Sequence, residues 1–295
     1  MKKESTHTLS LLLAGFFFAI LWSSASAATK IGLQSAQPFV IAVTRFFIAG
    51  TIMLFIAHGI LGKRLPEKQE WKQLVIYGLL NISIYLGLYV TAMQNVSAGL
   101  GSLSVGSSPV FISIMAAIWF KKPVKMVTII SLLLCITGII IAAYPLLKNS
   151  YATPMGMAIL LISMISYSAG AIYFSKSQWS HLHILTINGW QTLIGGIILL
   201  PVLALTYQRD KNIFDVKTIS SVLWLAIPVS IGAVQLWLFL LRNNPVKASF
   251  WLFLCPISGF IIAAILLKEP ISWYTFFGVV LVIAGLYLVQ KKRFA

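Results

Sequence analysis

Ten stretches of mostly apolar residues follow one another along the chain, separated by short polar connections. They lie at 8–28, 38–61, 71–93, 96–119, 125–147, 154–175, 182–206, 217–241, 246–267 and 272–290. Each is close to the roughly 20 residues that a helix needs to cross the hydrocarbon core of a bilayer. Over such runs a helix satisfies its own backbone polar groups without water. The pattern therefore predicts an all-α integral membrane protein with ten transmembrane helices.

Composition and charge agree with a membrane protein. Of 295 residues, 59% are hydrophobic and 9% are charged, against roughly 25% charged in a soluble domain. The net charge of +16 does not indicate a nucleic-acid partner, because the Lys and Arg residues sit in short clusters between apolar stretches. Most of them fall in the loops on one side. The positive-inside rule then places both termini in the cytoplasm of a bacterial inner (plasma) membrane.

The first apolar stretch has an alternative interpretation as a signal peptide. Lys2 and Lys3 precede the apolar run, and Ala-Ser-Ala at 25–27 could be a cleavage site. The run continues to Ala28, which makes it long enough to span. We therefore expect it to be retained as the first transmembrane helix.

The two halves of the chain carry matching sequence motifs, which indicates an internal repeat. Ser-Pro-Val at 108–110 precedes Lys-Lys-Pro-Val at 121–124, and Cys-Pro-Ile at 255–257 precedes Lys-Glu-Pro-Ile at 268–271 with the same spacing. We predict two five-helix repeats, at 1–149 and 150–295. Because five is odd, the repeats are inverted relative to each other in the membrane, which suits alternating access. An old duplication without functional asymmetry is the alternative.

Several short motifs resemble the ten-helix EamA-type branch of the drug/metabolite transporter (DMT) superfamily. They are Leu-Trp-Ser-Ser at 21–24, Thr-Arg-Phe-Phe-Ile-Ala-Gly at 44–50, Asn-Val-Ser-Ala-Gly at 95–99, Ser-Pro-Val-Phe at 108–111 and Leu-Lys-Glu-Pro-Ile at 267–271. The family often has Glu before the proline in both halves, whereas this chain has Lys122 and Glu269. The resemblance implies two inverted bundles around a central cavity, lined mainly by spans one, three, four, six, eight and nine, and transport of small metabolites.

Polar side chains recur every four residues in the third span. Tyr77, Asn81, Tyr85 and Tyr89 therefore lie near one helix face, and polar groups at membrane depth are costly towards lipid. We predict that Asn81 and Tyr85 contact the solute. Tyr77 and Tyr89 lie nearer the membrane ends, where aromatic belts form, so packing explains them equally well.

Other spans contribute further candidates for substrate binding. Small or polar residues, mid-span amides and aromatic rings make up this set: Trp22, Ser104, Ser108, Tyr167, Gln191, Gln235 and Trp251. The amides offer both donors and acceptors, and the rings could form walls. Close helix packing is the alternative for the serines, and interhelical hydrogen bonds for the amides.

Four residues are candidates for a structural or gating role. Pro109 and Pro256 fall at matched places in the two halves, where each could kink its helix. Glu269 lies near the outer face. Arg45 is a charge inside a span, and it is either tethered to helix carbonyls, snorkelling outward, or directed at a substrate carboxylate.

The chain lacks the usual signs of an energy source or a cofactor. None of its six acidic residues falls mid-span, and no phosphate-binding loop motif is present. His181 and His183 are weak evidence for metal. We expect no cofactor and no metal. A facilitative or exchange mechanism is favoured, with coupling through Glu269 as an alternative.

Together these patterns predict a secondary transporter, an exporter of small polar metabolites such as amino acids. Alternatives are an uptake carrier for S-adenosylmethionine-like or nucleoside-like metabolites, or a flippase for lipid-linked substrates. An intramembrane enzyme is disfavoured because no mid-span His, Asp or Lys could activate the span serines. We expect a small-molecule substrate and membrane lipid as partners, and a monomer or homodimer.

Overall fold

The computed structural model describes residues 2–119, 121, 123–149, 151–243 and 251–291. Within these ranges side chains are described from Ser10 to Leu288, apart from 238 and 241–243. The described chain contains helices and short connections, without strands. Lys122 and the first residues of the predicted ninth span, 246–250, lie outside the described residues.

The first half of the chain holds five helical paths, most of them made of more than one segment. In order these are α1 (Lys2–Gly32); α2 (Pro38–Leu54) with the π-helix η1 (Phe55–Ile60); α3 (Lys68–Gly78), the π-helix η2 (Leu79–Ile84) and α4 (Tyr85–Ala92); α5 (Ala98–Gly106) with α6 (Ser108–Trp119); and α7 (Met126–Lys148).

The second half repeats this order. It consists of α8 (Pro154–Lys176); α9 (Ile184–Thr206); the 3-10 turn η3 (Arg209–Lys211); α10 (Val216–Trp224), the π-helix η4 (Leu225–Ala233) and α11 (Val234–Asn243); the 3-10 turn η5 (Trp251–Phe253) with α13 (Leu254–Leu267); and α14 (Trp273–Lys291). A π-helix thus interrupts the third path of the first half and the corresponding path of the second.

Local chemistry explains where several helices begin. Pro38 and Pro154 stand in the first turns of α2 and α8, where a missing N–H costs nothing. The side chains of Ser97, Thr153 and Asp215 each accept a hydrogen bond from a backbone N–H three residues later. These N-caps satisfy donors that the first turn leaves free.

The described residues contain seven helical stretches that are long and apolar enough to cross a membrane. An eighth is the pair α5–α6, which bends by 43° at its break. The last two apolar helices, Trp251–Leu267 and Trp273–Leu288, are shorter. Each of the ten predicted spans therefore contains a helix, but ten full crossings and an inverted repeat remain a prediction.

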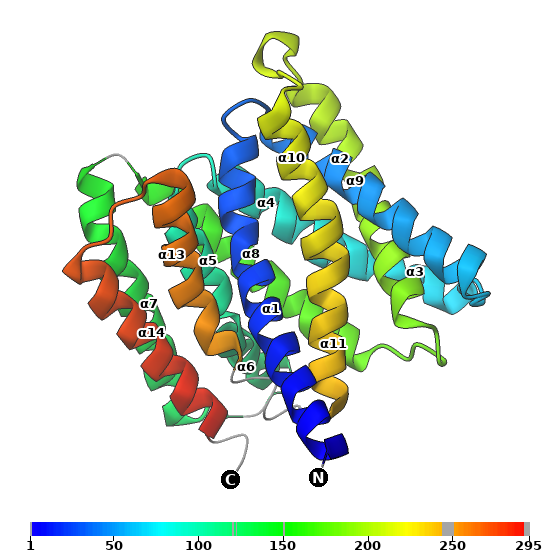
Figure 1. Ribbon diagram of the computed structural model, residues 1–295, viewed down its shortest axis with the longest axis horizontal. Helices are drawn as coiled ribbons and strands as arrows, with labels where there is room; N and C mark the ends of the chain where they lie inside the picture. The colour runs from blue at the N-terminus through cyan, green and yellow to red at the C-terminus, as the bar shows by residue number, and fades with distance from the viewer. Residues whose placement is uncertain (1, 120, 122, 150, 244–250, 292–295) are drawn as a thin grey trace.

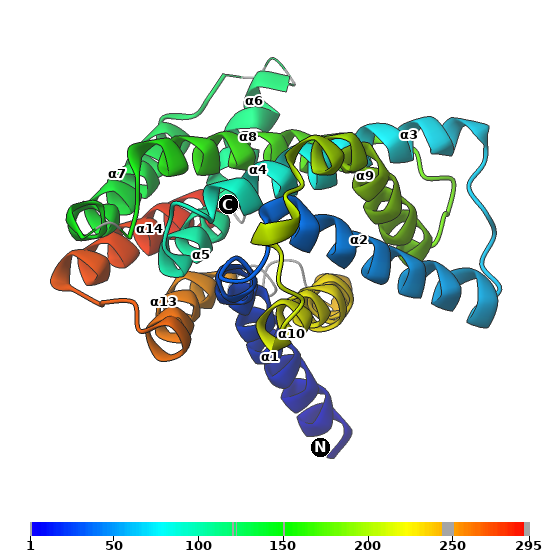
Figure 2. The same ribbon diagram turned by 90° about the horizontal axis from the view of Figure 1, so that it is seen from above.

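The two halves are interleaved rather than separate. Helix α2 packs along α9, and α7 packs along α14 (Figures 1 and 2). Helix α1 contacts α10, α11 and α13, while α8 contacts α4, α5 and α6. Several contacts of helices in one half thus have counterparts in the other half.

Glycines allow the closest of these approaches. A methyl group on Gly138 of α7 would lie 2.6 Å from the carbonyl oxygen of Gly278 on α14, and one on Gly278 would lie 2.5 Å from that of Gly138. Small residues at such crossings let helix backbones approach closely where lipid supplies no hydrophobic drive.

Candidate functional site

A cavity of about 120 Å³ lies among the helices of both halves, and we call it the central cavity. Its walls come from α1, α2, the α3–η2–α4 path, α5, α8, α9 and the η4–α11 path. Spans two and seven therefore contribute residues that the family resemblance did not lead us to expect. The described part of α13, in the ninth span, contributes none.

Amide side chains form one part of the wall. The Nδ2 of Asn81 donates to the Oε1 of Gln191 at 3.1 Å, and the Nε2 of Gln191 donates to the Oδ1 of Asn188 at 2.9 Å. Asn81 stands in the π-helix η2, whose wider turn changes which side chains face inward, and such segments are frequent at functional sites. The amide chain joins the third span to the seventh.

Aromatic rings with polar tips form another part. The rings of Tyr85 and Tyr167 lie with their centroids 4.8 Å apart. The hydroxyl of Tyr89 is 2.8 Å from the Oγ of Ser26 on α1. Trp22 lines the cavity one turn before Ser26. Flat apolar faces and hydroxyl groups therefore meet in one small space.

Arg45 brings a positive charge to the central cavity. Its Nε donates to the Oγ of Ser230 at 3.1 Å, and its guanidinium carbon lies 5.7 Å from the ring centre of Phe46. The sequence left three alternatives open for Arg45: a tether to helix carbonyls, snorkelling outward, or a role towards a substrate carboxylate. The described partner is instead a hydroxyl from the π-helix η4 on the other half of the chain.

The structure brings together one set of the predicted binding residues and separates another. Those that line the central cavity are Trp22, Asn81, Tyr85, Tyr167 and Gln191. Those that lie away from it are Ser104, Ser108, Gln235 and Trp251. Whether any of them contacts a solute remains a prediction.

Packing accounts for the position of two members of the second set, Ser104 and Trp251. Ser104 is fully buried, and Trp251 covers Gly15 of α1 within an apolar cluster that includes Phe18. Gln235 is half-buried on α11. Helical spacing predicts which side chains face inward, but it does not indicate which of them a neighbouring helix will cover.

Sequence reasoning missed Ser26, Asn188 and Ser230. Asn188 lies three residues before Gln191, so it falls on the same helix face, and that spacing could have found it. Ser26 lies one turn after Trp22 by the same logic. No comparable signal marks Ser230, because the π-helix around it alters the helical periodicity.

The two matched prolines each stand in the first turn of an α-helix. Pro109 is the second residue of α6, directly after the bend at Ser107, and Pro256 is the third residue of α13, after η5. The first turn tolerates the missing N–H. At Pro109 the structure shows a break between two helices, whereas before Pro256 the 3-10 turn η5 continues directly into α13. A gating role for either proline remains a prediction.

Glu269 caps a helix of the other half. Its two carboxylate oxygens accept hydrogen bonds from the backbone N–H groups of Ala98, at 2.6 Å, and Gly99, at 3.0 Å. Lys30 donates to the carbonyl oxygens of Met93, Gln94 and Val96, which lie in the connection between α4 and α5. Opposite charges therefore hold both sides of the connection between α4 and α5.

Polar contacts also tie the loops near α10 to the loop between α1 and α2. Ser35 donates to the Oδ2 of Asp215 at 2.8 Å. Asn212 accepts from the backbone N–H of Gln37 and donates to its side-chain oxygen, each at 2.8 Å. The N–H of Thr218 and the hydroxyl of Ser35 lower the pKa of the Asp215 carboxyl below its ordinary value. We call these contacts the loop latch.

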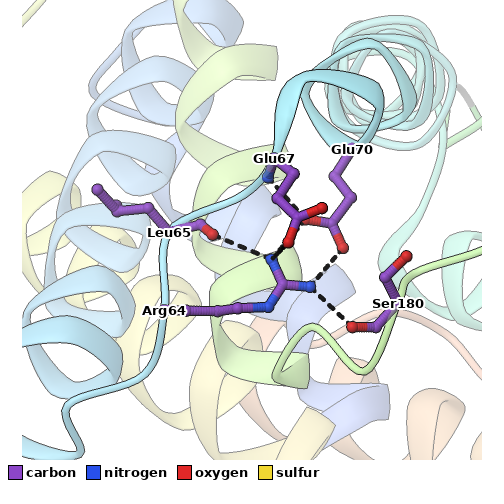
Figure 3. Close-up of polar contacts among 5 residues, drawn as sticks. All are labelled: Arg64, Leu65, Glu67, Glu70 and Ser180. Carbon is purple, nitrogen blue, oxygen red and sulfur yellow. Dashed lines mark hydrogen bonds and ion pairs between the residues drawn. The ribbon is translucent and has the colours of Figure 1, made fainter.

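A separate ionic cluster joins the loop before α3 to the loop after α8 (Figure 3). Arg64 forms two hydrogen bonds of 2.7 Å with the carboxylate of Glu70 and a 3.6 Å ion pair with Glu67. It also donates to the carbonyl oxygens of Leu65 and Ser180. The paired geometry fits a planar guanidinium, and the cluster lies away from the central cavity.

Comparison with known proteins identifies the family of the chain. The chain matches the EamA-like transporter family twice, over residues 9–144 and 154–290. It belongs to that family. It is therefore a multi-pass membrane protein of a transporter family, whose drug/metabolite transporter character the short motifs had suggested.

Curated relatives are named as transporters or carry names without a stated substrate. An uncharacterized transporter of Archaeoglobus fulgidus is 29% identical, with 92% of this chain and 95% of that protein covered. Protein PecM of Dickeya dadantii is 26% identical (93% and 90%), and the uncharacterized inner membrane transporter YedA of Escherichia coli is 26% identical (96% and 94%).

A solved crystal structure shares the fold. It superposes with a TM-score of 0.66 at 16% identity, covering 95% of this chain and 96% of that one. At this identity the likeness concerns the arrangement of helices alone.

Proposed function

We propose that this protein is a secondary transporter that exports small polar metabolites such as amino acids across a bacterial inner membrane. The observation that supports this is the central cavity, where amides, tyrosines and one arginine from both halves of a transporter-family chain surround a space of about 120 Å³. Side chains that hydrogen-bond are tolerated at membrane depth when they face such a space.

Alternating access is the mechanism we infer, with the two halves rocking around the cavity as inverted repeats. The process is facilitative or an exchange. Glu269 is poorly suited to proton coupling, because both of its oxygens already accept backbone hydrogen bonds. No enzymatic activity is part of this proposal.

Transport into proteoliposomes tests the proposal. The purified protein is reconstituted, presented with an equimolar pool of the common amino acids, and the accumulated solutes are read by mass spectrometry. We expect accumulation of some members above protein-free vesicles, and at least a tenfold lower rate for Asn81→Leu, which removes the amide that bonds Gln191.

Thr44→Val is the matched control. Thr44 is exposed on the outer face of α2, so its loss should leave transport unchanged. Vesicles with wild-type protein that accumulate nothing from the pool would contradict the proposed function.

A further inference from the structure

Arg45 is the charged side chain of the central cavity. The other described residues that line the cavity include no Asp, Glu or Lys. The Nε of Arg45 bonds Ser230, whereas its two terminal nitrogens have no hydrogen-bond partner within the described part of the chain. The half of the guanidinium that is best suited to bind a carboxylate is therefore unused.

No described acidic side chain lines the central cavity, and three of them have partners elsewhere. Glu70 pairs with Arg64, Glu269 caps α5, and Asp215 accepts from Ser35 and Thr218. A cation at membrane depth needs an anion, carbonyl groups or water. An anion that arrives with the solute is the partner the described cavity leaves open.

The cavity also has two chemically different ends. Arg45 lines a small side pocket together with Tyr89, whereas Asn81 belongs to the amide chain. Asn81 and Tyr89 are eight residues apart on one helical path, which corresponds to about 12 Å of rise. Between them lie the rings of Tyr85 and Tyr167. The charge, the rings and the amides thus follow one another along the cavity.

We propose that Arg45 anchors the carboxylate of the transported solute, so that the carried class is small monocarboxylates whose apolar or aromatic body lies against the tyrosines. This rests on the proposed function and makes it more specific. A planar guanidinium matches a carboxylate through two parallel hydrogen bonds. Ser230 positions the guanidinium by holding its Nε.

Matched probes test the anchor in proteoliposomes. The pool contains tyrosine, tyrosinamide and tyramine, with leucine, leucinamide and isopentylamine, at equal concentrations. Each amide has almost the size of its acid but lacks the carboxylate. We expect the acids to be carried at least about tenfold faster than their amides and amines by wild type. In Arg45→Gln this preference should fall to less than about threefold.

Two further variants separate binding from folding. Arg45→Lys keeps the charge without the planar fork, so it should retain part of the preference for the acids. Arg209→Gln removes an exposed arginine in η3 and should keep the full preference. Size-exclusion profiles in detergent identify any variant that does not fold.

The outcomes are distinct. Wild type that carries amides as fast as acids overturns the anchor, whatever the variants do, and leaves the transporter proposal intact. A preference that persists in folded Arg45→Gln also overturns it. Wild type that carries none of the six compounds overturns the anchor proposal, because tyrosine and leucine are the class it names, whereas the pool of common amino acids tests the transporter proposal separately.

Discussion

Glu269 shows how a single residue can hold together two distant parts of the chain. Its carboxylate is buried and bonds the first two N–H groups of α5, which lie some 170 residues earlier. The positive end of the helix dipole reinforces these bonds. The acid that the family motif carries is thus a helix cap in this protein.

Replacing Glu269 by Gln should lower the free energy of unfolding by about 2 kcal/mol, because one of its two charge-assisted hydrogen bonds is lost and the other loses its charge. Thermal unfolding in detergent measures the change. Asp210→Asn is the control, since Asp210 is exposed in η3; it should shift stability by less than about 0.5 kcal/mol. Equal effects of the two variants would count against the cap.

Asp215 predicts a pH dependence. Its folded-state pKa is lowered from 3.8 by the Thr218 N–H and the Ser35 hydroxyl. The stability it contributes is therefore present above its unfolded pKa and is lost as the pH falls through the folded one. We expect the difference in Tm between wild type and Asp215→Asn to be full at pH 6 and to shrink below pH of about 4. A constant difference across that range would refute the assignment.

Helix elements meet in this fold through glycine contacts. The crossing of α7 and α14 depends on Gly138 and Gly278, each of which faces the other's backbone. Backbone atoms cannot move aside as a flexible side chain does. The helix pair would have to separate to admit even a methyl group.

Gly278→Ala should therefore destabilise the protein by roughly 1–3 kcal/mol, despite the better helix propensity of alanine. Gly232→Ala is a matched control in η4, where a new methyl group would find its nearest atoms at 3.7 and 3.9 Å. Thermal unfolding of both variants gives the comparison. A Gly278→Ala protein as stable as Gly232→Ala would show that α7 and α14 do not approach each other closely at Gly278.

At the scale of the whole molecule, alternating access requires that contacts between the halves open. The loop latch joins the loop before α2 to the loop before α10, and these loops belong to different halves. The ionic cluster around Arg64 also joins the two halves, through the hydrogen bond from Arg64 to the carbonyl oxygen of Ser180. Both links are candidates for bonds that break and re-form during transport.

Asn212→Ala should favour the state in which the latch is open. It removes hydrogen bonds to Gln37 worth about 1 kcal/mol each, which shifts such an equilibrium roughly fivefold or more. A membrane-impermeant thiol reagent, added on the side of the latch, would report this through faster labelling of Asn188→Cys in the cavity. The native Cys135 and Cys255 are buried.

Asn149→Ala provides the control for the latch. Asn149 is an exposed residue that follows α7, and its loss should leave the labelling rate unchanged. An Asn212→Ala protein that labels as slowly as this control would show that the latch does not limit access to the cavity.

Local pattern was sufficient to predict the helices of this protein. Apolar runs of the length of a bilayer leave the backbone no stable alternative to a helix, so each predicted span contains one. The same energetic rule indicated that Asn81, Tyr85 and Gln191 turn away from lipid, and they do line one cavity. The family motifs predicted the family. These inferences need only the residue and its immediate neighbours.

Which side chains meet was decided by the tertiary structure. Asn81 bonds Gln191 across 110 positions and Arg45 meets Ser230 across 185, whereas Trp251 and Ser104 are covered by other helices. The cost of exposing a polar group to lipid determines which helix face turns inward. The polar group itself can then be satisfied equally well by a hydrogen-bond partner, by a cavity or by water. Helix crossings set by glycines and turns widened by π-helices choose among these, because they depend on contacts between residues far apart in the chain.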